Sequence, residues 1–153
     1  MTKLLLSIHV LASILVVGPI AVAASLFPRY ARLAGEDGRS SGAAALLHRI
    51  CSGYAVVGVA VPVFGLATGA QLGVLTDIWL IVSIVLTTIA AAILALAILP
   101  GQERMIETTE AGAAGADTAR IAARLAGLTG VFNLLWAVVV VLMIVRPGST
   151  TGA

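Results

Sequence analysis

Two histidines, His9 and His48, are the side chains best suited to hold a haem iron or a copper ion. His9 falls about one and a half turns inside a long apolar stretch, and ionisable groups at membrane depth often have a function. Two interpretations of His9 stay open: a metal or haem ligand, or a neutral imidazole hydrogen-bonded to Ser13 or to a carbonyl group of a neighbouring helix. His48 stands beside Arg49, which is typical of an interfacial residue.

The two histidines are not expected to share one iron within one chain, because the predicted topology separates them by about 20 Å along the membrane normal. Met143 is expected at about the depth of His9, so the two side chains can be drawn as a histidine and methionine pair of axial ligands. His9 and Met143 are therefore the candidate haem- or metal-binding residues, with simple packing as the alternative for Met143. Cys51, the single cysteine, is expected to be a small packing residue.

The other motifs that carry chemistry are absent from the sequence. It has no Walker loop, no dinucleotide-binding glycine fingerprint, no G-x-S-x-G elbow and no Cys/His cluster for a dedicated metal site. Asp77 and Glu103 fall at the two predicted membrane edges, so that no acid is buried deeply enough for a proton relay. Asn133 lies within a span, and we expect it to fix helix register. The sequence therefore predicts no catalytic residue and favours a protein that is not an enzyme.

Only a membrane can accommodate the chain that carries these residues. Of its 153 residues, 60% are hydrophobic and 10% are charged, which is more apolar surface than a soluble domain of this size can bury. The net charge of +2 is too small to indicate binding to nucleic acid. Ala, Gly and Arg are abundant, as in GC-rich bacteria, and we expect a multi-pass protein of the bacterial cytoplasmic membrane.

Hydropathy divides the chain into four apolar spans, each long enough to cross a hydrocarbon core of roughly 30 Å. The predicted spans are residues 4–27, 46–74, 78–99 and 125–145. The polar connections are residues 28–45 and 100–124, and Pro100-Gly101 is interpreted as the end of the third helix. We expect a single all-α domain over residues 1–153, a four-transmembrane-helix bundle.

Basic residues predict the orientation of this bundle. Of the nine Lys and Arg residues, only Lys3 and Arg146 lie away from the first and third connections. By the positive-inside rule these two connections are cytoplasmic and both termini face outward. The basic segment after the first span also argues against a cleaved signal peptide, despite the A-x-A pattern at residues 21–23.

Small residues predict where the helices pack. Glycines recur one helical turn apart on the second span, and a row without side chains lets a neighbouring helix approach closely. The third span has a smooth face of small residues, which we expect to meet the glycine row. The predicted packing residues are Gly65, Gly69, Gly73, Ala91 and Ala95.

The order of these features resembles a bacterial family of predicted four-helix integral membrane proteins of unknown function. The resemblance rests on His9 followed by Gly18, a second helix ending in Thr68-Gly69, Pro100 after the third, and the closing run of residues 142–147. More distantly, the chain is similar to the copper-resistance D type membrane domain and to HemJ-type protoporphyrinogen oxidases. The latter similarity implies haem bound through His9, although this chain has no intramembrane lysine.

Three classes of function remain open. The first is a structural or accessory protein that packs in the lipid bilayer with itself, as a homo-oligomer, or within a larger membrane complex. The second is a haem- or copper-binding redox protein that uses His9, with Met143 or a second subunit supplying the other ligand. The third is an oligomeric small-solute transporter, for which Pro19 and Pro62 are possible kink sites. Abundant packing residues and few reactive groups favour the first class, without a cofactor.

Overall fold

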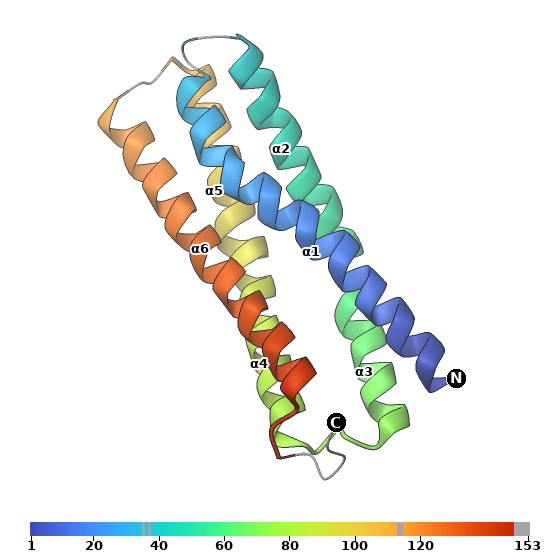
Figure 1. Ribbon diagram of the computed structural model, residues 1–153. Coiled ribbons are helices and arrows are strands. Elements are labelled where there is room, and N and C mark those ends of the chain that lie inside the picture. The colour runs from blue at the N-terminus through green and yellow to red at the C-terminus, as the bar shows by residue number, and fades with distance from the viewer. Residues whose placement is uncertain (35, 37, 113–114, 149–153) are drawn as a thin grey trace.

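The protein consists of four long helical rods, seen in a computed structural model that describes residues 1–34, 36, 38–112 and 115–148. The elements are α1 (Thr2–Leu33), α2 (Gly38–Val57), α3 (Ala60–Leu72), α4 (Ile78–Ile93), the π-helix η1 (Leu94–Ile98), α5 (Leu99–Glu110) and α6 (Ala116–Val145). α2 runs on into α3, and α4 runs through η1 into α5 (Figure 1). The four resulting rods are long and apolar enough to cross a membrane. The predicted all-α four-helix membrane fold is confirmed.

The helices extend beyond the predicted spans at the arginine-rich end. α1 continues through Pro28 to Leu33, and α2 begins at Gly38, so the segment 28–45 is mostly helical and not an extended loop. α6 begins at Ala116, well before residue 125. A helix of 32 residues is about 48 Å long, more than the hydrocarbon core requires. The charged residues therefore occupy helical turns that project from the membrane.

The third rod continues through Pro100-Gly101, where the sequence predicts a helix end. The N–H group of Leu99 donates to the carbonyl of Leu94, five residues back, which closes the π-helix η1. Pro100 then falls in the first turn of α5, where its missing N–H is least costly. Because the wider turn accommodates one extra residue, α5 is rotated by about 100° relative to a continuous α-helix.

The second rod breaks between α2 and α3, as expected near Pro62. The proline ring has no N–H group to donate to Gly58, and the carbonyl of Gly58 instead accepts from Val61 at 3.0 Å. The helix therefore loosens at Gly58 and Val59 and resumes at Ala60.

α1 crosses the middle of the bundle and contacts α2, α3, α5 and α6 (Figure 1). The buried positions of the bundle include many alanines, which let the rods approach closely: Ala23, Ala24, Ala31, Ala44, Ala90 and Ala122. Large apolar side chains such as Val56, Ile78 and Leu134 are exposed on the outer faces. This arrangement suits a bundle whose surroundings are hydrocarbon.

The three glycines of the predicted packing row have different roles. A Cβ atom on Gly69 would lie 2.9 Å from Leu80 Cδ2, so Gly69 does allow α3 to approach α4. Gly65 instead faces the imidazole of His9 on α1. Gly73 is not a packing residue: it has φ +69° and ends α3 in the left-handed conformation that glycine adopts most easily.

The smooth face of the third span does not meet the glycine row within one chain. Ala91 and Ala95 are exposed, whereas the neighbouring Ala90 is fully buried. The reason is that α4 packs mainly against α6, while α3 approaches α4 only near the turn that joins them. Ala91 and Ala95 therefore face outward.

Replacing Gly69 by Leu is expected to force α3 and α4 apart and to lower the free energy of unfolding by about 1–3 kcal/mol, since the added atoms have no room. The matched control is Gly130→Leu on α6, because a Cβ atom at Gly130 meets nothing within 4 Å. Denaturant unfolding in detergent micelles measures both. Equal stability of the two variants would contradict the tight contact at Gly69.

Candidate functional site

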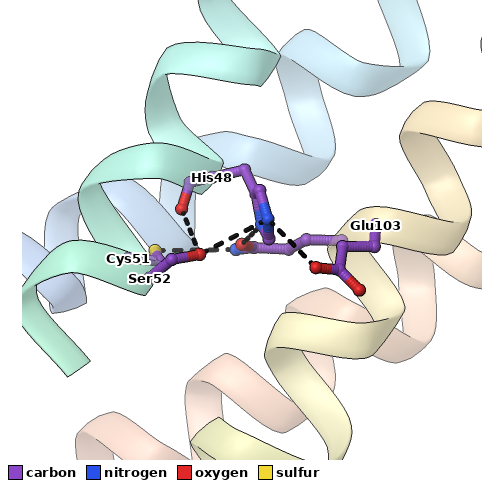
Figure 2. Close-up of polar contacts among 5 residues, drawn as sticks. His48, Cys51, Ser52 and Glu103 are labelled. Carbon is purple, nitrogen blue, oxygen red and sulfur yellow. Dashed lines mark hydrogen bonds and ion pairs between the residues drawn. The ribbon is translucent and has the colours of Figure 1, made fainter. Parts of the chain in front are cut away.

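A cluster of polar side chains joins α2 to α5 inside the arginine-rich half of the bundle (Figure 2). His48 Nδ1 lies 3.0 Å from Gln102 Oε1. A carboxamide oxygen can only accept, so Nδ1 carries the hydrogen and donates it. Gln102 itself is almost completely buried, at 1% exposed. A buried amide needs such partners, and the bond therefore fixes how α5 meets α2.

Cys51 extends this cluster toward α1. Gln102 Nε2 donates to Cys51 Sγ at 3.6 Å, and the thiol points to the carbonyl of Ile20 on α1 at 4.0 Å. Cys51 is fully buried. The predicted packing role of this cysteine thus includes a polar contact, and the cluster connects three helices.

Ser52 and Glu103 surround the other ring nitrogen of His48 (Figure 2). Ser52 Oγ lies 3.3 Å from Nε2 and donates its own hydrogen to the carbonyl of His48 at 2.9 Å. Glu103 Oε1 lies 3.6 Å from Nε2, and the carboxylate is largely exposed. The Glu103 side chain therefore connects the part-buried ring of His48 to the surface of the protein.

The π-helix brings Gln102 into this cluster. Without the extra residue in η1, the residues of α5 would be turned by about 100°, so Gln102 and the fully buried Met105 would leave the interior. π-helical turns occur often at functional positions. Sequence reasoning missed Gln102 because Pro100-Gly101 indicated a loop; the spacing of His48 and Ser52, four residues apart, was the available signal.

His9 holds α1 against α3 near the opposite end of the bundle. Its Nδ1 lies 2.9 Å from the carbonyl of Val61, and Ser13 donates to the carbonyl of His9, not to the ring. The ring fits where Gly65 has no side chain, since a Cβ atom there would lie 2.8 Å from Cε1. Of the two interpretations, the structure contains the bond to a neighbouring helix. That bond places the hydrogen on Nδ1 and leaves the lone pair of Nε2 available.

Met143 lies at a different depth from His9. The contact of Asn133 Nδ2 with Ser25 Oγ, at 3.3 Å, sets the register of α6 against α1. From this contact His9 is sixteen residues along α1 and Met143 is ten along α6, a difference in depth of about 9 Å for parallel axes. The pairing of these two side chains on one iron stays a prediction that this register does not favour.

Asn133 belongs to a line of polar groups on α6. Its Oδ1 atom is buried without a hydrogen-bond partner among the described residues, and so are Thr129 Oγ1 and Trp136 Nε1. The three residues share one face of the helix. The bond from Asn133 to Ser25 agrees with its expected part in helix register.

A further polar group lies at the end of the bundle where α1 begins and α6 ends. Asp77 is the N-cap residue of α4, but its carboxylate accepts from Trp79 Nε1 at 3.0 Å and makes no cap bond. The guanidinium of Arg146 stacks over the Trp79 ring at 5.6 Å. This group ties the end of α6 to the start of α4.

Replacing Gln102 by Leu is expected to lower the free energy of unfolding by about 1–3 kcal/mol, because His48 loses its acceptor. The double variant His48→Leu/Gln102→Leu is expected to recover part of this loss, since neither partner is then left unpaired. Thr108→Val, on the outer side of α5, is the control and should change little. If the losses in free energy of unfolding of the two single variants simply added in the double variant, the contact between His48 and Gln102 would be contradicted.

The chain matches one family model along nearly its whole length. The match covers residues 3–147, and the family is described as "Predicted integral membrane protein (DUF2269)". No curated protein and no solved structure matches the chain. The matched segment contains both histidines and, apart from Thr2, all four rods. The chain belongs to the DUF2269 family of predicted integral membrane proteins.

Proposed function

We propose that this integral membrane protein has a structural or accessory role and assembles, with a second copy or within a larger complex, through the outer face of the third rod. The observation that carries the proposal is an exposed stripe of small side chains where α4 continues into η1. The stripe consists of Thr88, Ala91 and Ala92 on α4 and Ala95 on η1.

Small residues facing hydrocarbon have a specific use in membrane proteins. Lipid tails solvate leucine as well as a neighbouring helix does, so helix association depends on close van der Waals packing. A smooth stripe permits that packing. Within the chain, Gly65 and Gly69 already accommodate His9 and Leu80, so the stripe on the third rod is the better candidate for contacts between chains.

The proposed location is the bacterial cytoplasmic membrane, with the arginine-rich end in the cytosol. The start of α1 and the end of α6 lie at the same end of the bundle (Figure 1), as four spans require. The arginines in and beside the two turns at the opposite end support the inward orientation of that end.

The variant Ala91→Leu/Ala95→Leu is expected to weaken association about tenfold, or about 1.4 kcal/mol, because the new side chains hold the partner helix away. Energy transfer between labelled chains at a series of protein-to-lipid ratios in liposomes measures this change. Thermal stability of the single chain should be retained, since both positions are exposed.

The matched control is Ala70→Leu, an exposed alanine on α3. This variant should associate as the parent chain does. Unchanged association of the Ala91/Ala95 variant, or an equal loss in the control, would overturn the proposal.

A second candidate function is haem or copper binding through His9, and one observation favours it. The bond from Nδ1 to the Val61 carbonyl orients the ring and leaves Nε2 free, which is the usual arrangement of a ligating histidine. The described residues contain no group of three or more His, Cys, Asp or Glu that could hold a metal. In this proposal the second axial ligand comes from Met143 or from another copy of the chain, and the difference in depth between His9 and Met143 favours the second copy.

An absorption spectrum of the protein purified from haem-supplied cells, with copper analysis of the same sample, tests this candidate. A Soret band or bound copper that is lost in His9→Ala and kept in His48→Ala would support it. A colourless, copper-free protein would exclude it.

A further inference from the structure

A cleft of about 250 Å³ opens between the third rod and α6 at the arginine-rich end of the bundle. Its walls include Leu96, Ala97, Pro100 and Leu128. Gly101 also lines the cleft and contributes no side chain to fill it. Both η1 and α5 contribute to one wall, so the cleft depends on the same π-helical turn that places Gln102 inside.

Two arginines form the charged rim of this cleft, Arg104 from α5 and Arg124 from α6. Both are exposed, and neither makes an ion pair within the described part of the chain. The nearby Glu103 faces His48, and Arg120 is the arginine that pairs with Asp117. The rim thus presents two guanidinium groups that are unpaired within the described part of the chain, and both can bind an anion.

The charged rim and the apolar walls follow one another in the same order as the head group and the acyl chains of a phospholipid. Leu96 lies eight residues before Arg104, and Leu128 lies four residues after Arg124, so the apolar walls extend about 6–12 Å from the arginines toward the membrane centre. A phosphate at the rim would leave an acyl chain against Leu96 and Leu128. Arginine pairs well with phosphate because its planar group donates two parallel hydrogen bonds.

The size of the cleft also favours part of a lipid over an enclosed soluble ligand. Pockets that bury a whole small molecule have volumes of roughly 300–1,000 Å³. The cleft is smaller than this range. Basic pockets between transmembrane helices are typical binding places for anionic lipid head groups.

We propose that this cleft binds an anionic phospholipid of the leaflet at the arginine-rich end, with Arg104 and Arg124 on its phosphate and the acyl chain on the apolar walls. The inference is independent of the proposed association through the third rod.

Native mass spectrometry of the detergent-purified protein, titrated with defined lipids, tests the site. Phosphatidylglycerol is expected to bind about thirtyfold more tightly than phosphatidylcholine, the ratio that two basic residues give near an anionic membrane surface. The variant Arg104→Gln/Arg124→Gln should abolish this preference. Ala97→Phe should weaken phosphatidylglycerol binding without a change of charge, because it fills the cleft.

The matched control is Arg29→Gln/Arg32→Gln, which removes two exposed arginines of α1 that do not line the cleft. It should keep the preference, and a melting temperature near that of the parent chain should be seen for every variant. Equal binding of the two lipids, an unchanged preference in the Arg104/Arg124 variant, or an equal loss in the control would overturn the proposal. Displacement by inorganic phosphate alone would also overturn it, since the apolar walls would then be unnecessary.

Discussion

Hydrocarbon offers no hydrogen-bonding partner to a peptide group, and this constraint shapes the bundle more than any single side chain does. A helix satisfies its own backbone, so each proline must be accommodated by a local change. Pro62 loosens the second rod at Gly58 and Val59, and Pro100 follows a π-helical turn. That turn rotates α5, which places Gln102 beside His48 and opens the cleft below Arg104. One backbone requirement therefore determines both the buried polar cluster and the charged rim.

The hydrophobic pattern of the sequence predicts four spans, and the rods agree with it, because a stretch without charges has few stable alternatives to a membrane helix. The same pattern says little about lateral neighbours. The spans are apolar on all sides, so no polar face marks which side meets lipid. Ala91 and Ala95 were expected opposite the glycine row, yet they face outward, while Gly65 accommodates an imidazole from the first helix. Side-chain packing among the four helices decides which faces become neighbours, and the local spacing of residues does not encode that choice.

In the candidate site, too, the sequence indicates which residues are unusual but not which residues they contact. His9 could be recognised as unusual because a polar ring in a long apolar stretch needs a partner, and the sequence suggested a neighbouring carbonyl group as one possibility. The partner itself, Val61, depends on how α1 crosses α3. Gln102 was missed because Pro-Gly is usually a helix end, and only the compensating π-helix shows that the amide is interior. A Pro-Gly pair thus need not end a membrane helix, because a π-helical turn can accommodate the proline.

The close approach of Gly65 to the His9 ring has an evolutionary consequence. Any methyl group at position 65 would occupy the space of the imidazole, so a relative with a larger residue there must carry a smaller one at position 9. The two positions should therefore change together through the lineage, although 56 positions separate them in the sequence. A histidine retained without its glycine would have to adopt another rotamer, and α1 would lose its hydrogen bond to α3.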